Sequence, residues 1–321
     1  MSLLHCRVSS RLRRLIPLLV VAAGLLVGCE SGSQERGTAG PVPPAPSNYR
    51  DFESADRLSA YLRSDALPLV GAHRGGATER FPENALPTFA QSLTHGPVLL
   101  EVDVRMTKDS VLVLMHDETL ERTTSGQGTV GAQTLEALRG LRLTADTGRT
   151  TRFAVPTLAE ALAWAEGRAV LQLDVKENVP RSAVANLLRR REALDQALVI
   201  TYTLEGARWY HRQLPELLLS VSAETAEKAK EYFEQIDPSR LVAFVGVGRP
   251  SEAVLRVFSR RDVPVTVGTF GDLDRQARQR GLVVYRNLFR QGVDIIATDE
   301  TALASQAAAT YRPEPSAEGR P

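Results

Sequence analysis

The sequence predicts an α/β fold of the TIM-barrel type, and three observations support this prediction. Short runs of aliphatic and β-branched residues alternate with amphipathic segments from residue 68 to residue 312, a pattern typical of parallel strands joined by right-handed helical crossovers. The number of these units favours a closed (β/α)8 barrel over an open doubly wound sheet. No glycine-rich dinucleotide or P-loop fingerprint follows the first strand, which weakens the open-sheet alternative. We therefore expect a single barrel domain at 51–312.

Nine segments have the composition of strands, although a barrel of this type has eight. They are 69–73, 98–104, 111–116, 169–175, 197–203, 217–222, 241–248, 263–270 and 293–299. One of the segments 217–222 and 241–248 is expected to be irregular or extra, and the sequence favours neither. Amphipathic helices are expected at 157–167, 182–194, 251–261 and 280–292. Segment 118–156 has turn signals and little periodicity, so we expect a small insertion between the third strand and its helix.

The N-terminal segment predicts an exported protein with a lipid anchor. Four arginines precede an apolar run at 15–28, which is too short to span a membrane comfortably as a permanent helix. The run leads into LVGC (26–29), which resembles the bacterial lipobox. This resemblance implies that a signal peptide, 1–28, is removed and that Cys29 then carries several acyl chains, enough to hold a protein stably at a membrane. A plain signal anchor and ordinary secretion are the alternatives.

The segments that flank the predicted domain have the composition of disordered chain. Residues 29–50 are rich in Gly, Ser and Pro, so we expect a tether between the lipidated Cys29 and the domain. Residues 313–321 are expected to be a disordered tail. The globular domain would then face the extracytoplasmic side of the cell envelope, in the periplasm or at the cell surface.

Charge and cysteine content exclude several classes of function. The chain has 39 Lys and Arg against 38 Asp and Glu, a formal net charge of +1, so no bulk field attracts it to nucleic acid. Its two cysteines, Cys6 and Cys29, both precede the expected domain. That domain therefore has no thiol for a disulfide, a thiolate metal site or a cysteine nucleophile.

Carboxylates interrupt two of the apolar strand segments. Glu101 and Asp103 alternate within 98–104 and so share one face of a strand, and Asp174 lies near the end of 169–175. All three lie toward the carboxyl ends of their strands, where TIM barrels build their active sites. Converging carboxylates repel one another unless a cation neutralises them. Because hard oxygen ligands suit Mg²⁺ or Ca²⁺, we expect a divalent cation here.

Two histidines and two cationic residues accompany the carboxylates. His73 ends the first strand segment and His116 the third, so the two are interpreted as an acid/base pair that works near neutral pH. Arg74 and Lys176 supply positive charge for an anionic substrate. A metal, two histidines and two cations without a thiol or serine nucleophile indicate metal-assisted attack at a phosphorus centre.

At these residues the sequence resembles the glycerophosphodiester phosphodiesterase family. The matching motifs occur in the family's order and spacing: AHRGG (72–76), FPENALPTF (81–89), LLEVDVRMTKD (99–109), LMHDETLERTT (114–124), VPTLAEAL (155–162), LQLDVKE (171–177) and GVDIIATD (292–299). The resemblance implies a TIM barrel that hydrolyses glycerophosphodiesters to glycerol phosphate and an alcohol with a divalent cation. Carried over by position, His73 and His116 match the catalytic histidines and Glu101 and Asp103 match two metal ligands. Residues that match the phosphate and glycerol contacts are Arg74, Glu83 and Lys176.

This chain departs from the family pattern at two places. Asp174 stands where many members have Glu, and the strand VTVGTFG (265–271) lacks the aromatic residue that often opens it. Two other classes of function are kept as alternatives. One is a lysophospholipase D or sphingomyelinase D-like activity on lipid phosphodiesters, and the other is a lipoprotein that binds its ligand without catalysis.

Several further residues have structural interpretations. Glu83 either precedes a helix as a favourable N-terminal charge or belongs to the site, with equal support for each. We interpret Asp117 and Arg122 as ties for the loop after His116, and Asp299 as a residue that fixes the last loop. Three aromatic residues are expected to be ordinary core residues rather than to line the mouth of the pocket: Phe81, Tyr202 and Phe270.

Overall fold

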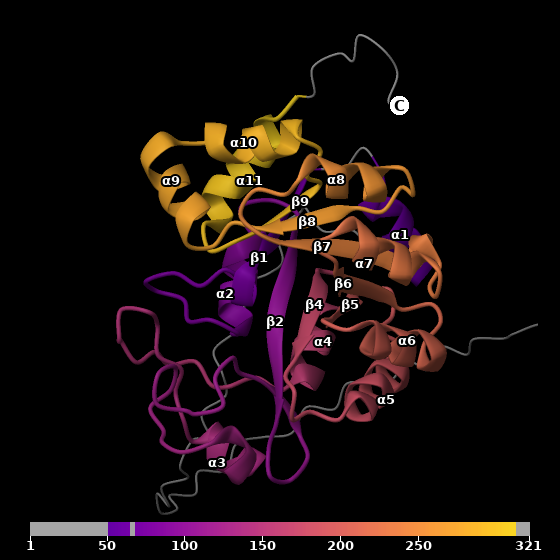
Figure 1. The fold of residues 1–321 in the computed structure, drawn as a ribbon. Coiled ribbons are helices and arrows are strands. Elements are labelled where there is room, and N and C mark those ends of the chain that lie inside the picture. The colour runs from indigo at the N-terminus through magenta and orange to yellow at the C-terminus, as the bar shows by residue number, and fades with distance from the viewer. Residues whose placement is uncertain (1–50, 65–67, 313–321) are drawn as a thin grey trace, which may run out of the picture. The chain divides into compact units, whose positions relative to one another are not determined.

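Eight parallel strands close into a barrel, as the sequence predicts (Figure 1). The computed structural model describes residues 51–64 and 68–312, so the expected signal peptide, the tether with Cys29 and the tail lie outside the described residues. The barrel strands are β1 (Leu69–Ala72), β2 (Val98–Met106), β4 (Val170–Val175), β5 (Ala197–Thr201), β6 (Leu218–Ser222), β7 (Leu241–Val247), β8 (Val265–Gly268) and β9 (Ile295–Thr298). Strand β1 pairs in parallel with both β2 and β9, which closes the sheet.

The extra strand is β3 (Leu112–Leu114), which lies antiparallel on β2 with Leu114 opposite Val104. The expectation that 217–222 or 241–248 was extra is therefore wrong, because both are barrel strands, β6 and β7. Only residues 107–111 separate β2 from β3. A chain this short can form a hairpin turn but cannot make the crossover of a dozen or more residues that a parallel neighbour requires.

The insertion at 118–156 consequently follows a hairpin strand and stands between barrel strands β2 and β4. It contains the short helix α3 (Leu135–Arg139), and Figure 1 shows it beside the extended end of the β2–β3 hairpin. Its apolar residues pack on β3 as a separate small core, which consists of Ala85, Val113, Met115, Leu120, Val130, Leu138, Leu143 and Val155. The insertion therefore has its own packing and holds the segment that carries His116 and Asp117.

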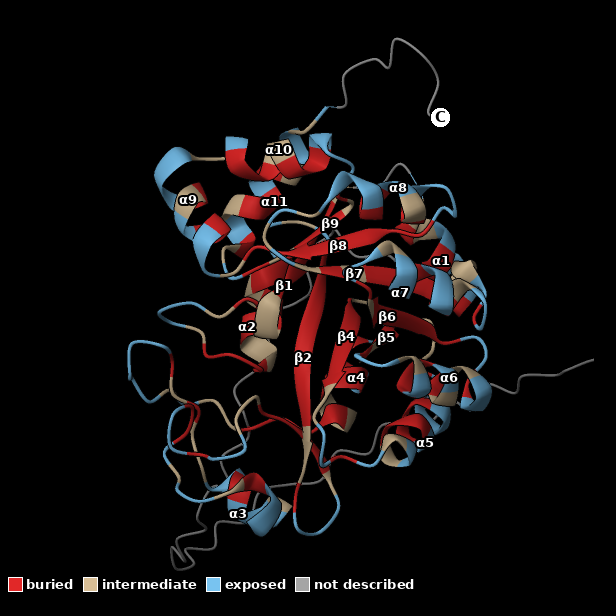
Figure 2. Cartoon of the chain, viewed as in Figure 1, coloured by how far each residue is buried: buried red, intermediate tan, exposed pale blue. Residues whose placement is uncertain are grey.

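Helices cover the outer face of the barrel (Figure 2). They are α2 (Leu86–Leu93), α4 (Leu158–Ala165), α5 (Arg181–Arg191), α6 (Leu204–Gln213), α7 (Ala226–Phe233), α8 (Glu252–Ser259), α9 (Asp272–Arg280), α10 (Val283–Arg290) and α11 (Thr301–Thr310). The expected helices at 157–167, 182–194, 251–261 and 280–292 correspond to α4, α5, α8 and α10. Helix α4 begins with a capping box between Thr157 and Glu160, which satisfies two backbone donors at its start.

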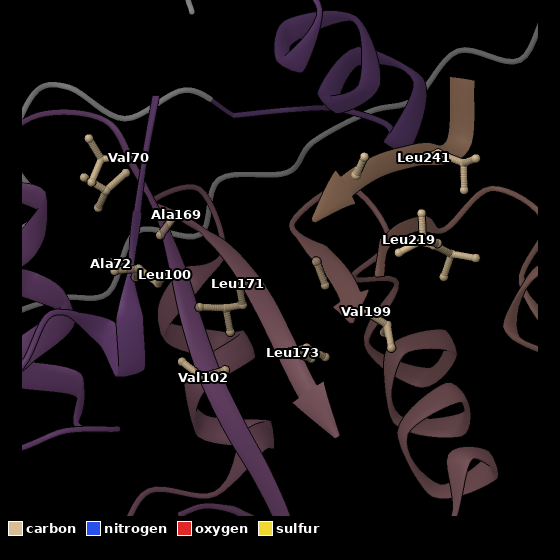
Figure 3. Packing of buried hydrophobic residues seen from close by; sticks show 14 of the residues in the cluster. Val70, Ala72, Leu100, Val102, Ala169, Leu171, Leu173, Val199, Leu219 and Leu241 are labelled. Atoms are coloured by element: carbon tan, nitrogen blue, oxygen red, sulfur yellow. The ribbon is translucent and has the colours of Figure 1, made fainter. Parts of the chain in front are cut away.

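Alternation along each strand divides the apolar residues between two cores. Val70, Leu100, Val102, Leu171 and Leu173 belong to the cluster between the strands and the helices (Figure 3). A second cluster fills the amino-terminal end of the barrel: Leu69, Leu99, Val170, Leu198, Leu218, Val242 and Ile295, with Phe52, Leu58 and Leu62 from the α1 (Ala55–Leu62) region. This end is closed by apolar packing, which leaves the carboxyl ends of the strands for chemistry. Among the helices that the structure describes, none has the length and apolar character needed to cross a membrane.

Candidate active site

A cavity of about 370 Å³ opens at the carboxyl ends of the barrel strands. Five of the residues singled out in the sequence for catalysis or metal binding line it together with Lys176. The full lining is His73, Glu101, Asp103, His116, Gln172, Asp174, Lys176, Ile200, Tyr202, Ser220, Ser222, Phe244, Val247, Thr266, Phe270 and Ala297. Every barrel strand or the loop that follows it thus contributes to one space.

Three carboxylates meet on one wall of this cavity. Glu101 and Asp103 are two residues apart on β2, so their side chains point to the same side of the sheet. In the parallel pairing of β2 with β4, Asp103 stands directly beside Asp174. One carboxylate oxygen from each residue lies within 4.8 Å of the other two. The strand register therefore brings together the three metal ligands expected from the sequence.

The charge of this cluster is only partly balanced by the protein. Lys176 Nζ lies 2.6 Å from Asp103 Oδ1 and 2.5 Å from Asp174 Oδ2. Although burial opposes it, the lysine charge, with hydrogen bonds from Lys176 and Asn84, lowers the pKa of Asp103. Within the described residues Glu101 makes no ion pair, and its Oε2 accepts a hydrogen bond from the Arg74 N–H at 2.7 Å. Burial and the neighbouring Asp103 charge raise the pKa of Glu101 to about 8.

This donor set fits a divalent cation. Three carboxylate oxygens form a hard ligand set of the kind that Mg²⁺ and Ca²⁺ prefer. Burial and the neighbouring anion raise the pKa of Glu101, which means that its ionised form is destabilised. A cation at this position would stabilise that ionised form. The single ammonium of Lys176 meets two of the carboxylates and leaves the third without a cationic partner in the described part of the chain.

The segment Pro82-Glu83-Asn84 holds Asp103 in place. Asn84 Nδ2 donates to Asp103 Oδ2 at 2.7 Å, and the Asp103 N–H donates to Asn84 Oδ1 at 2.9 Å. The Asn84 N–H in turn donates to the Arg74 carbonyl. Asn84 has a φ of 56°, a left-handed conformation that Asn tolerates better than most residues. The reciprocal pair of hydrogen bonds fixes both the backbone and the carboxylate of Asp103.

The loop after β1 turns sharply to present both His73 and the N–H that meets Glu101. Arg74, Gly75 and Gly76 are left-handed in succession, with φ of 52°, 82° and 85°. A Cβ on Gly75 would lie 2.2 Å from the Phe89 ring, so both conformation and space require glycine there. The two glycines of the HRGG motif therefore allow this turn to pack against α2 beneath the site.

Each histidine in the cavity is held by a carboxylate on its Nδ1 atom. His73 Nδ1 lies 2.7 Å from Asp299 Oδ1, and His116 Nδ1 lies 2.8 Å from Asp117 Oδ1. Burial alone would lower the pKa of His73, but the hydrogen bond to Asp299 and the nearby Glu101 charge raise it. Because Nδ1 is engaged in both rings, Nε2 is the atom that each can offer to a substrate.

Asp299 has a more specific position than sequence reasoning gave it. Its backbone N–H donates to Asp274 Oδ2 at 2.9 Å, and Asp274 Oδ1 accepts from Tyr285 and Thr298 hydroxyls, each at 2.8 Å. Asp274 is 1% exposed. Asp299 thus belongs to a fixed loop, as expected, and also orients a histidine, for which its place directly after β9 was the available signal.

A chain of ion pairs continues outward from His116. Arg122 Nε lies 2.5 Å from Asp117 Oδ2, and Arg122 also binds Glu83 through two nitrogens at 2.9 Å each. Arg74 Nη1 binds the same Glu83 at 2.9 Å. The hydrogen bonds to Arg122 and His116 hold the pKa of Asp117 well below its usual range, against the opposing effect of burial. Arg122 and Asp117 therefore tie down this loop, as interpreted from the sequence.

Glu83 belongs to this network and does not cap a helix. It is 4% exposed, and the N-cap of α2 is Ala85. Neither Glu83 nor Arg74 is among the residues that line the cavity. Arg74 Nε instead approaches Asp103 Oδ2 to 4.0 Å. Both residues therefore support the site through ion pairs with Asp103 and Arg122 without lining the cavity.

Two aromatic residues expected in the core line the cavity instead. Tyr202 is 60% exposed, and its hydroxyl donates to Asp174 Oδ1 at 2.9 Å. Phe270 stacks on His73 with ring centroids 4.6 Å apart. Both lie within two residues of the carboxyl end of a barrel strand, β5 or β8, which was the signal that could have identified them. Phe81 stacks on Phe153 at 6.3 Å and is not part of the lining.

Comparisons with known proteins identify phosphodiesterases of similar sequence or fold. A solved glycerophosphoryl diester phosphodiesterase from Parabacteroides distasonis is 32% identical, covers 81% of this chain and 93% of its own, and superposes with a TM-score of 0.74. Human glycerophosphodiester phosphodiesterase 1 is 40% identical over 119 residues, 36% of this chain. The alignment spans only about a third (35%) of that curated relative. An Oleispira antarctica phosphodiesterase shares the fold, with a TM-score of 0.62, 22% identity, and coverage of 75% of this chain and 96% of its own.

The model of the glycerophosphoryl diester phosphodiesterase family matches residues 73–302. This match runs from His73, which directly follows β1, to the start of α11. It therefore includes both histidines and all three carboxylates. The chain belongs to the glycerophosphoryl diester phosphodiesterase family.

Proposed function

We propose that this protein hydrolyses glycerophosphodiesters to glycerol phosphate and an alcohol. The observation that carries the proposal is the juxtaposition, in one cavity, of three carboxylates whose oxygens lie within 4.8 Å and two imidazoles held by carboxylates. Family membership supports the same activity. The solved Oleispira antarctica relative is described as a complex with the product sn-glycerol-3-phosphate, and a product of the same class is proposed for this chain.

Glu101, Asp103 and Asp174 would hold the divalent cation, Mg²⁺ or Ca²⁺. When bound, such a cation neutralises charge on the phosphate and makes the phosphorus a better electrophile. Lys176, which lines the cavity beside Asp103 and Asp174, would place a second positive charge near the phosphate. Arg74 and Glu83 are proposed to support substrate binding indirectly. Arg74 approaches Asp103, and Glu83 holds Arg74 in place through an ion pair.

His73 and His116 are proposed as the acid/base pair. One accepts a proton at Nε2 from the attacking hydroxyl while the other donates a proton to the leaving alcohol. Attack by water gives glycerol phosphate directly, whereas attack by a substrate glycerol hydroxyl gives a cyclic phosphate that a water molecule must then open. Asp299 and Asp117 accept hydrogen bonds from the Nδ1–H groups and so would keep Nε2 free to face the substrate. Because one imidazole takes a proton and the other gives one, the reaction needs no covalent bond between the phosphorus and the protein.

Hydrolysis of glycerophosphocholine tests the proposal. We expect glycerol phosphate to be released in the presence of MgCl₂ or CaCl₂ and not after removal of the metal with EDTA. His116→Ala is expected to lower kcat by about 10²- to 10⁴-fold, the contribution of general acid–base catalysis. Asp103→Ala is expected to lower kcat by about 10³-fold, since a bound metal supplies several kcal/mol of charge stabilisation. His95→Ala is the matched control, because His95 is exposed and lies outside the cavity lining. Activity that survives both site substitutions would refute these roles.

We also propose that a lipid on Cys29 anchors the protein outside the cytoplasm. The support is the basic and apolar pattern of 1–28 that leads into LVGC. Cys29→Ala is expected to move the protein from the membrane fraction to the soluble fraction, with a loss of acyl mass on the N-terminal peptide. An unmodified Cys29 in the membrane-associated protein would contradict lipidation and favour a signal anchor.

A further inference from the structure

The wall of the cavity that faces the carboxylates differs from them in chemistry. Going around the closed barrel, β7 stands opposite β2 and β8 stands opposite β4. The lining residues from β6 to the loop after β8 carry no ionisable group, and they are Ser220, Ser222, Phe244, Val247, Thr266 and Phe270. The charged wall and this uncharged wall therefore lie on opposite sides of the cavity.

Two large apolar side chains are exposed to solvent at the mouth of the cavity. In the described part of the chain, three large hydrophobic residues are exposed: Tyr202 and Val247, each at 60%, and Val283 at 42%. The first two line this cavity, whereas Val283 lies on α10 and does not. Exposed apolar side chains gathered at one mouth mark a binding surface more often than isolated ones do.

The backbone around Val247 is shaped to hold this side chain at the mouth. The pairing of β7 with β8 is irregular between Phe244 and Val247, as at a β-bulge. Gly246 and Gly248, on either side of Val247, have φ of 99° and 101°, values that glycine adopts without strain. Bulges beside active sites commonly redirect a side chain in this way.

Gly268 lets the apolar residues of the mouth come together. A Cβ at this position would lie 2.6 Å from Phe270 Cζ and 3.1 Å from Val247 Cγ2. Phe270 and Val247 therefore approach each other across a residue without a side chain. Phe270 also stacks on His73, so this apolar surface extends up to one of the two proposed acid/base residues.

We propose that Val247, Phe270, Phe244 and Tyr202 form an apolar subsite that takes a hydrocarbon chain on the alcohol part of the phosphodiester. The proposal rests on the proposed function and specifies its substrate class: diesters whose alcohol has an apolar body are preferred over those with a small polar one. The wall from β6 to the loop after β8 has no ionisable group in the cavity lining, so an uncharged hydrocarbon chain can pack on it without removing a charge from water.

A series of ligands with increasing chain length tests the subsite independently of catalysis. The probes are glycerol esters of methyl-, butyl- and octylphosphonic acid, in which a P–C bond replaces the bond to the leaving oxygen. Their affinities are measured by calorimetry with MgCl₂ or CaCl₂ present, below the concentrations at which they form micelles. We expect affinity to rise by about threefold for each methylene that reaches the wall, the effect of burying such a group, and at least tenfold from methyl to octyl.

Val247→Ser and Val283→Ser form a matched pair of variants, since both replace an exposed valine. Val247→Ser is expected to reduce the ratio of octyl to methyl affinity by about fivefold, while methyl affinity and folding are unchanged. Val283→Ser is expected to leave the ratio unchanged. Equal affinity across the series, or an equal effect of the two variants, would overturn the subsite.

The corresponding diesters separate the subsite from the proposed function. If the phosphonates show the chain-length preference but no diester is hydrolysed, the function fails and the subsite stands. If methyl, butyl and octyl diesters are hydrolysed equally well, the subsite fails and the function stands. If Val247→Ser weakens binding to lipid vesicles without changing the phosphonate ratio, this wall contacts a membrane surface and the proposal is wrong.

Discussion

The two ends of the barrel are built from the same strands but bury opposite kinds of side chain, apolar at the amino-terminal end and charged at the carboxyl end. On β2, Leu99 belongs to the apolar cluster that closes the amino-terminal end, whereas Glu101 and Asp103 on the same face belong to the carboxylate cluster. All three are at least nine-tenths buried. Apolar burial at one end supplies stability, and burial of like charges at the other end costs stability until a cation is present. Within five residues of one strand, from Leu99 to Asp103, the same face thus passes from the apolar core to the candidate site.

The largest expected effects distinguish the two ends of β2. Leu99→Ala is expected to lower the free energy of unfolding by about 2–5 kcal/mol, because a buried leucine leaves a cavity, while kcat of the folded protein changes little. Asp103→Asn is expected to lower activity by about 10³-fold, because a weakened metal site loses several kcal/mol of charge stabilisation, without a comparable loss of stability. Urea unfolding and initial rates measure the two effects. Equal losses of stability in both variants would contradict the assignment of stability to the amino-terminal end of β2 and of catalysis to its carboxyl end.

The pH dependence of stability tests the charged end. The pKa of Glu101 is raised to about 8 in the folded protein, against 4.5 for a free carboxyl. Folding therefore favours its protonated form, and the metal-free protein should lose stability as pH rises from 4.5 to 8. The loss is on the order of 2–4 kcal/mol. Glu101→Gln should remove this dependence, and saturating Mg²⁺ or Ca²⁺ should suppress it in the wild type.

A thermal unfolding series in EDTA and in metal measures this prediction. If the stability of Glu101→Gln and of the wild type depends on pH in the same way without metal, folding does not raise the pKa of Glu101 and the prediction is wrong.

A smaller effect is expected where the charged end orients a histidine. Asp299→Asn is expected to lower kcat by about 10- to 100-fold, since part of the acid–base contribution depends on the orientation and tautomer of His73. Because the hydrogen bond to Asp299 raises the pKa of His73, the limb of the pH–rate profile that reports this histidine should move to lower pH. Loss of activity with an unmoved profile would indicate that Asp299 only stabilises its loop.

The smallest effect is expected at the apolar end. Asp56 and Arg240 form an ion pair at 2.5 Å between α1 and the start of β7, with the Asp56 side chain 76% exposed. An ion pair this exposed contributes about 0–1 kcal/mol, so Asp56→Asn should shift the midpoint of unfolding very little. Leu62→Ala, in the same helix but fully buried, is the contrasting variant and should cost several times more.

The fold and the carboxylate cluster could be predicted from the sequence because both follow from local patterns. Period-two alternation on β2 places Glu101 beside Asp103, and the rule that parallel strands share one functional end places Asp174 with them. The extra strand was misassigned because β3 and a barrel strand are equally apolar. Only the length of the connection, residues 107–111, distinguishes them.

What the sequence could not predict depends on contacts between distant segments. The bond between His73 and Asp299 joins residues 226 positions apart, and no local pattern relates them. Tyr202 was expected in the core because an aromatic residue after an apolar strand is usually buried, yet it stands at an open rim with its hydroxyl on Asp174. The role of Glu83 depended in the same way on Arg122, which the insertion brings to it.

The central claim is that Glu101, Asp103 and Asp174 bind one divalent cation between the two histidines. The most direct measurement is a crystal structure of the protein soaked in Mn²⁺, with anomalous scattering used to locate the ion. We predict a single strong peak within coordinating distance of all three carboxylates, which disappears in Asp103→Ala. A saturated crystal with no peak there, or with the ion bound elsewhere in the barrel, would contradict the account.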